Sequence, residues 1–412
     1  MRAPLLASLI LAAAAVACSG APARPAAATA ATSQAGGAPV GMRPAGTPET
    51  AKAQIVPTDD DAGGTAAEVF ERARLELTAG KYAHARVLFD RVVTAEAAEH
   101  PGAPGPLGRA AAYNAALCSE NLGDARDARD RFRALSKAAP GTSDAVDANL
   151  RRGRLDVEIE DWNDVGESAA VLLSSPDLSR WDRAEALALQ ALGMIHGAKD
   201  LSSAKKTVVQ AEKLLEKKDK PDEVPPPHNA AAVHFARGDL LRAEGDAMAF
   251  LDDKDPSAPI VAADFPVKME ARCQKILDAQ DAYIDAINTR ELAWAVRAGL
   301  RVATMYIELH RDVLAIPPPK SATTDEKKQL FKGAMRLRYR ILLEKGLGTL
   351  DRTLNLETAV GAKTAWLEHA RKAKATVEKQ LADEKAELAK LPYSEEELKK
   401  ALDNLSKKSA KA

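Results

Sequence analysis

The chain has 412 residues and a nearly neutral formal charge of −1, with 46% hydrophobic but only 4% aromatic residues. This length allows two or three conventional domains or one long repeat array. Alanine supplies much of the apolar content, which favours closely packed helices over a β-sandwich, because strands prefer aromatic and β-branched residues. The 58 Lys and Arg residues balance the 59 Asp and Glu residues. The composition therefore gives no basic face for nucleic acid.

The first 17 residues have the pattern of a signal peptide for export. Arg2 precedes an apolar run over 5–17 that is too short to span a bilayer. The run ends in Ala-Val-Ala directly before Cys18, which resembles the lipobox of bacterial lipoproteins, with Ala15 in place of the usual leucine. The resemblance implies a diacylglycerol anchor on Cys18 and an outer-membrane lipoprotein facing the periplasm. The same residues also fit ordinary signal peptidase, which would release a soluble periplasmic protein.

Residues 18–64 are expected to form a disordered linker behind the lipidated cysteine. Ala, Pro, Gly and Thr dominate this segment, and it has no apolar periodicity. As a flexible coil, roughly 45 residues span on the order of 35–40 Å. The linker would let the folded part reach partners away from the membrane.

Residues 65–222 carry a repeated pair of helices. In the clearest unit, 109–140, the small Ala116 lies in the first helix, Gly123 opens a turn, Phe132 lies in the second helix, and Pro140 ends it. These positions and spacings resemble the tetratricopeptide repeat family. The resemblance implies an all-α solenoid of helix-turn-helix units that bind proteins in a concave groove.

Two further units follow the same pattern, and a fourth is less regular. In the preceding unit Gly80, Ala85 and Phe89 have the same mutual spacings as in the clearest unit. The third unit has a turn at 160–162, and the fourth, over 181–215, has an uncertain phase. The array is predicted to cover 65–222.

Longer helices are expected in the second half of the chain. Three consecutive prolines at 225–227 mark a stiff joint. Residues 223–390 are predicted to form a helical domain that is an eroded continuation of the repeats, because Trp294 and Ala298 echo the first helix of a unit. This half is similar to envelope tetratricopeptide lipoproteins of myxobacteria and their relatives. Residues 391–412 are predicted to form a charged tail helix.

The sequence contains no recognisable catalytic or cofactor motif. The seven histidines include no His-Glu-x-x-His pair, and no phosphate-binding glycine loop or nucleophile elbow occurs. We therefore expect a protein that is not an enzyme and has no metal, cofactor or small-molecule substrate.

The predicted partners are other proteins of the cell envelope, bound in the groove that the first helix of each unit lines. Carrying the groove positions of the family onto the first three units gives Phe70, Arg74, Leu77, Tyr113, Leu117, Asn121, Leu150, Arg151 and Arg154. Aromatic and apolar anchors with arginines are typical of binding hot spots. The alternative is that the leucines pack between helices and the arginines are merely solvated.

These features predict an adaptor or scaffold anchored in the envelope. It would dock onto a machine such as outer-membrane assembly, export or gliding motility. The alternative function is a periplasmic solute- or lipid-binding protein, with a closed pocket lined by Trp294, Met305 and Tyr306.

Overall fold

The structure is a computed structural model that describes residues 63–176, 178–217, 222–248, 265–318, 322–360 and 365–401. The predicted signal peptide, Cys18, the linker up to residue 62 and the tail beyond 401 lie outside the described residues. Within them, all regular secondary structure is helical. The prediction of an all-α chain is confirmed.

Short helices form the first half of the described chain. These are α2 (Ala66–Thr78), α3 (Tyr82–Glu99), α4 (Pro106–Asn121), α5 (Ala125–Ala138), α6 (Ser143–Glu158), α7 (Trp162–Leu173), α8 (Arg180–Leu192), the π-helix η2 (Gly193–Ala198) and α9 (Leu201–Glu216). The second half consists of longer helices, namely α10 (Pro227–Asp246), α11 (Phe265–Asn288), α12 (Leu292–Leu314), α13 (Asp325–Val360) and α14 (Ala365–Ala389).

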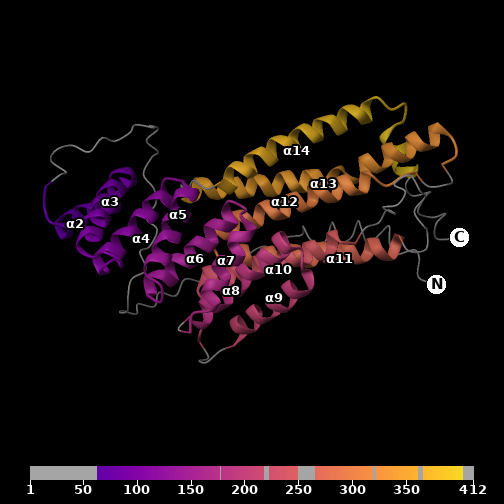
Figure 1. Ribbon diagram of the computed structural model, residues 1–412. Helices are drawn as coiled ribbons and strands as arrows, with labels where there is room; N and C mark the ends of the chain where they lie inside the picture. The colour runs from indigo at the N-terminus through magenta and orange to yellow at the C-terminus, as the bar shows by residue number, and fades with distance from the viewer. Residues whose placement is uncertain are drawn as a thin grey trace.

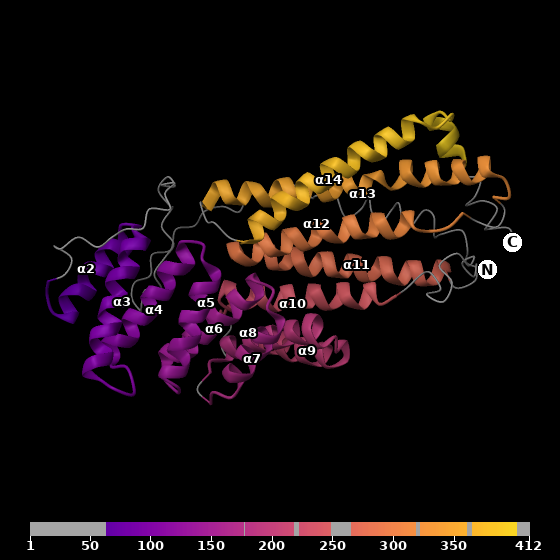
Figure 2. The ribbon, with the colours of Figure 1, turned by 45° about the horizontal axis from the view of Figure 1, so that its top comes forward.

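The helices stack as successive hairpins in one elongated molecule (Figures 1 and 2). Each helix packs on its chain neighbour, and α2, α4, α6, α8, α10, α12 and α14 also contact one another in that order. Contacts between alternate helices of this kind are the arrangement expected of a solenoid. The short hairpins lie at one end, and α11–α14 extend toward the other (Figure 2).

Local sequence signals define the ends of the hairpin helices. Thr65 and Glu68 form a capping box that starts α2. The turns inside the first two hairpins place Gly80 and Gly123 at φ values of 77° and 80°, where glycine is favoured. The third turn places Glu160 at φ 58°. The turn predicted at 160–162 is therefore present, although it lacks a glycine.

Aromatic wedges hold the first two hairpins together. Phe89 and Phe132 are fully buried at equivalent positions of α3 and α5. Each packs edge-on against the aromatic ring of the preceding helix, Phe70 for Phe89 and Tyr113 for Phe132. This geometry confirms the repeat phase predicted for 65–140.

The fourth hairpin contains the irregularity that obscured its phase in the sequence. Helix α8 passes directly into the π-helix η2 before α9 begins. A π turn accommodates an additional residue, so the spacing between the two helices of the hairpin differs from that of the other units. Gly193 lies where an added Cβ would be 3.2 Å from the backbone of Gly166. This close approach favours glycine, because any side chain here would push the backbone of Gly166 away.

The core continues across the triple-proline joint without interruption. Helix α10 packs on both α8 and α9. One hydrophobic cluster reaches from Leu150 on α6 to Leu342 on α13 and contains the buried stripe of α12, including Trp294 and Val302. The helices after the joint are therefore built onto the array, and the boundary predicted at 222/223 does not separate two cores.

Candidate functional site

The predicted groove residues of α2 form a partly exposed apolar surface. Phe70 and Leu77 are half-buried against the hydrophobic cluster that α2, α3 and α4 form around Phe89. Arg74 is exposed and forms an ion pair with Glu71, one helical turn away, at 3.1 Å. A pair of exposed charges of this kind contributes little to folding. Breaking this ion pair so that Arg74 can contact a partner would therefore cost little free energy.

Helix α4 continues this surface with Tyr113, Leu117 and Asn121. Tyr113 and Leu117 are half-buried, while Asn121 is exposed and donates its side-chain amide to the carbonyl oxygen of Leu117 at 2.8 Å. Burial raises the pKa of the Tyr113 hydroxyl, and the charge of Arg151 opposes that rise. The hydroxyl therefore stays protonated at neutral pH.

Arg151 of α6 is held against α4 by two polar contacts. Its Nε donates to the hydroxyl oxygen of Tyr113 at 2.8 Å, and its Nη1 donates to Glu120 at 2.9 Å. The guanidinium carbon also lies 5.8 Å from the centre of the Tyr113 ring. A third of the Arg151 side chain remains exposed. The arginine is thus fixed in position while its outer side faces solvent.

The other two predicted residues of α6 are Leu150, which is buried, and Arg154, whose side chain is 25% exposed. Leu150 is 5% exposed and belongs to the large core cluster. Arg154 donates to both carboxylate oxygens of the fully buried Glu185, at 2.5 and 2.8 Å. Asn229 donates to the same carboxylate at 2.8 Å. Arg154 therefore neutralises a buried acid, while a quarter of its side chain stays exposed.

Helix α12 contacts the C-terminal end of α6. Arg297 of α12 is 3% exposed, and its Nη2 donates to the carbonyl oxygen of Arg154 at 3.2 Å and to Glu158 at 3.4 Å. Its guanidinium carbon lies 4.6 Å from the ring centre of Trp294 and 6.0 Å from that of Trp366. The chain therefore curves until α12 lies against the end of α6.

A second buried polar cluster joins four elements behind this contact. Asp239 of α10 accepts from the Tyr283 hydroxyl at 2.5 Å and lies 2.6 Å from His196 Nε2 and 3.5 Å from Arg301 Nε. Burial alone would raise the pKa of Asp239, but Arg301 and His196 hold it well below its usual value. Asp239 is therefore a structural counter-ion.

The predicted site residues thus divide into two groups. Seven of them are partly or fully exposed on α2, α4 and the adjoining Arg151 of α6, and this set is here called the α2–α4 face: Phe70, Arg74, Leu77, Tyr113, Leu117, Asn121 and Arg151. Of the other two, Leu150 is buried in the core and Arg154 is paired with Glu185.

The residues proposed for a ligand pocket are packed inside the protein. Trp294 contacts the ring of Phe235, with centroids 5.1 Å apart, and Met305 belongs to the large core cluster. Tyr306 donates its hydroxyl to Gln280 at 2.5 Å. These contacts give no support to a solute- or lipid-binding pocket around the three side chains.

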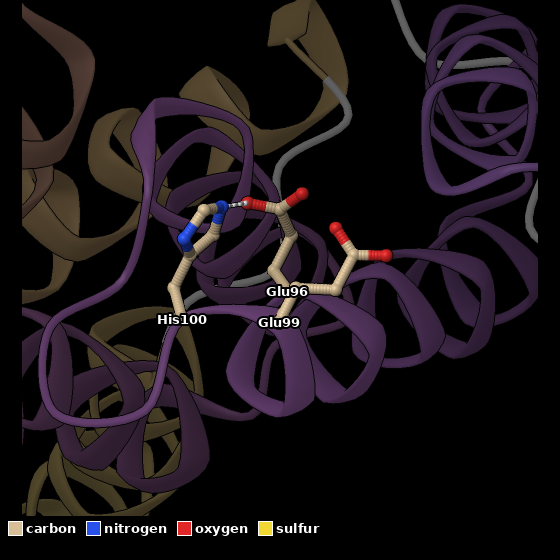
Figure 3. A group of neighbouring side chains, drawn as sticks. All are labelled: Glu96, Glu99 and His100. Atoms are coloured by element: carbon tan, nitrogen blue, oxygen red, sulfur yellow. Dashed lines mark ion pairs between the residues drawn. The ribbon is translucent and has the colours of Figure 1, made fainter.

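A cluster that the sequence reasoning missed lies at the end of α3 (Figure 3). Glu96, Glu99 and His100 bring their side chains together there. The signal that could have found it is the run Glu-x-x-Glu-His before Pro101, because the spacing places all three residues on the last turn of one helix.

Comparisons with known proteins give little further information. No family model matches the chain, and no curated protein matches it. Among solved structures, a tetratricopeptide repeat protein from Parabacteroides merdae has 11% sequence identity and a TM-score of 0.38, covering 76% of this chain and 100% of that one. This similarity is too low to transfer a partner or an activity. In the described residues, no helix combines the length and apolar character that crossing a bilayer requires.

Proposed function

We propose that this protein is a non-catalytic adaptor that binds another protein through the α2–α4 face. The observation that carries the proposal is the half-exposure of Phe70, Leu77, Tyr113 and Leu117 on adjoining helices. On α6, Arg154 is paired with Glu185, and its carbonyl oxygen accepts a hydrogen bond from Arg297 of α12. Apolar side chains left partly exposed on one rigid surface, with an arginine at its edge, are the composition of a binding hot spot.

The rigidity of the face supports this function. Tyr113 is fixed by Phe132 on one side and by Arg151 on the other. A side chain that is already ordered loses little conformational entropy when a partner binds. Arg151 can still offer its exposed side to a carboxylate or a carbonyl group of the partner. The face therefore favours a segment that combines apolar and acidic residues.

We further propose that the adaptor acts in the cell envelope, held to the outer membrane on the periplasmic side by lipidated Cys18. The proposal rests on the signal-like residues 1–17 and the cysteine that follows them. Two or more acyl chains would give a firm anchor. The partner would then belong to an envelope machine, such as those for outer-membrane assembly, export or gliding motility. The alternative localisation is the periplasm, as a soluble protein.

The binding face can be tested by adding negative charge at its exposed positions. The double variant Arg74→Glu and Asn121→Asp should lose the partner in affinity capture from crosslinked cells. Its melting temperature should stay close to that of the wild type, because exposed substitutions usually change the free energy of unfolding by less than about 0.5 kcal/mol. The matched control is Lys399→Glu with Lys400→Glu, both exposed near the end of the described chain. Loss of the partner from the control but not from the double variant would contradict the proposal.

A further inference from the structure

The last turn of α3 gathers three side chains that can donate to a metal ion. One ligand atom each of Glu96, Glu99 and His100 lies within 4.8 Å of the others. Figure 3 shows Glu96 between the other two residues, with the imidazole of His100 directed at its carboxylate. Glu96 and Glu99 lie in the last turn of α3 and His100 is its C-cap residue, so the chain needs no long-range contact to bring them together.

Glu96 is the unusual member of this cluster because it is buried. The residue is 7% exposed, and its Oε2 lies 3.9 Å from Nε2 of the exposed His100. This separation is too long for a hydrogen bond, so only charge attraction would join the two groups. An ionised carboxylate that has lost its water needs a positive charge or donors close by. A metal ion held between the carboxylate of Glu96 and the imidazole of His100 would supply such a charge.

The loop before α4 packs directly on the cluster. A Cβ atom added to Gly105 would lie 2.9 Å from Glu96 Oε2 and 3.1 Å from His100 Cδ2. One added to Gly108 would lie 3.0 Å from the Cβ of Glu96. Glycine at both positions leaves the space that the acid and the imidazole occupy. Glu99 and His100 are exposed on the other side, which gives an ion a path from solvent.

We propose that Glu96, Glu99 and His100 bind a divalent transition-metal ion such as Zn²⁺. Two carboxylates balance the charge of the ion, and an imidazole favours transition metals over Mg²⁺ or Ca²⁺. A tetrahedral zinc site with ligands at about 2.0–2.1 Å holds its donor atoms about 3.3 Å apart. The three donor atoms lie within 4.8 Å of one another, so they would move closer together on binding one ion. The unpaired carbonyl groups at the end of α3 also favour a cation there.

The ion would have a structural consequence at the junction between the first two hairpins. The ligands occupy the end of α3, and the loop that carries Gly105 leads directly into α4. Neutralising Glu96 removes a buried charge from this junction. Binding to the folded state alone would raise the melting temperature by mass action.

The test uses the full chain purified without a histidine tag, treated with a chelator and titrated with Zn²⁺ in a calorimeter. The wild type should bind one Zn²⁺ at this site, and its melting temperature should rise with added Zn²⁺. The variants Glu96→Gln and His100→Asn should weaken this binding by at least the roughly 10–100-fold that follows loss of an outer-shell partner. They should also lose the rise in melting temperature.

The matched control is His369→Asn, which removes an exposed histidine next to Glu368 on α14. It should bind Zn²⁺ as the wild type does. Circular dichroism of Glu96→Gln should match that of the wild type, because the substitution keeps the shape of the side chain. Equal Zn²⁺ affinity in wild type, Glu96→Gln and His100→Asn would overturn the proposal, as would tighter binding of Mg²⁺ than of Zn²⁺.

Discussion

Arg151 and Arg154 lie one helical turn apart on α6 and have different roles. Arg151 is braced by Tyr113 and Glu120 on α4 and keeps part of its surface in solvent. Arg154 neutralises Glu185, which is completely buried. A buried acid without its partner costs far more than an exposed one. Arg154 is therefore fixed by folding, and Arg151 is free to contribute to binding.

Asp239 gives the clearest prediction for a single side chain. Replacing Asp239 with Asn removes the buried carboxylate that faces Arg301 and His196, and leaves Arg301 with Glu160, at 3.6 Å, as its remaining acidic partner. The free energy of unfolding should fall by about 3–5 kcal/mol. Tyr283→Phe removes one hydrogen bond to the same carboxylate and should cost only about 1–2 kcal/mol. Urea unfolding of both variants measures the difference, and equal losses would contradict the role assigned to the carboxylate.

The effect of Asp239 should depend on pH in a defined direction. Its pKa in the folded protein lies below the value of about 3.9 expected for the unfolded chain. A lowered pKa stabilises the fold above the unfolded value, and this contribution disappears as the pH falls below it. The gap in unfolding free energy between wild type and Asp239→Asn should therefore shrink as the pH falls below about 4. A gap that grows in acid would contradict this account.

At the scale of elements, the hairpins are held by wedges at the junctions between helices. Phe132 of α5 is completely buried and packs against Tyr113 of α4. Phe132 therefore supports Tyr113, a residue of the α2–α4 face, from inside the second hairpin. Leu155 and Ala148 of α6 belong to the same small cluster, so the wedge also connects the second hairpin with the third.

Removing this wedge should destabilise the array strongly. Phe132→Ala should lower the free energy of unfolding by about 3–5 kcal/mol, because it removes buried apolar surface and leaves a cavity. Val171→Ala on α7, where the valine is 46% exposed, is the control and should cost less than about 1 kcal/mol. Thermal and urea unfolding report both changes. Similar small losses in the two variants would argue against the hairpin packing.

Two elements show what the sequence could predict and what it could not. The first two hairpins were predictable because Gly80 and Gly123 set the turns, and Phe89 and Phe132 recur at fixed distances from them. The π-helix η2 was not predictable, because one additional residue in a turn leaves no local signal in an alanine-rich helix. It moves the following helix out of the expected repeat phase.

At the scale of the whole molecule, the curvature of the array decides which surface remains open. Arg297 meets the end of α6 only because the intervening hairpins turn the chain back on itself. The sequence positions of Leu150 and Arg154 are those of groove residues, so local patterns could not exclude them. Leu150 is buried in a core cluster that reaches to α13, and Arg154 pairs with Glu185 of α8. The sequence could place these residues on the first helix of a unit, but it could not predict the long-range contacts that hold them.

The proposed lipid anchor at Cys18 can be tested separately from the binding face. Cys18→Ser should move the protein from the membrane pellet to the soluble periplasmic fraction, because the acyl chains supply the anchor. Mass spectrometry of the wild type should find an acylated amino terminus at Cys18. A variant that still pellets with membranes, or a wild type with an unmodified cysteine, would favour the soluble alternative.

Site-specific photo-crosslinking in living cells tests the central claim most directly. A photo-crosslinking amino acid in place of Arg74 or Asn121 puts the probe at exposed positions of the α2–α4 face, and one in place of Val224, which is 76% exposed, puts it outside that face. The account predicts one common protein adduct from the first two positions and none from the third. An adduct from position 224 with none from positions 74 and 121 would show that the protein binds its partner through another surface.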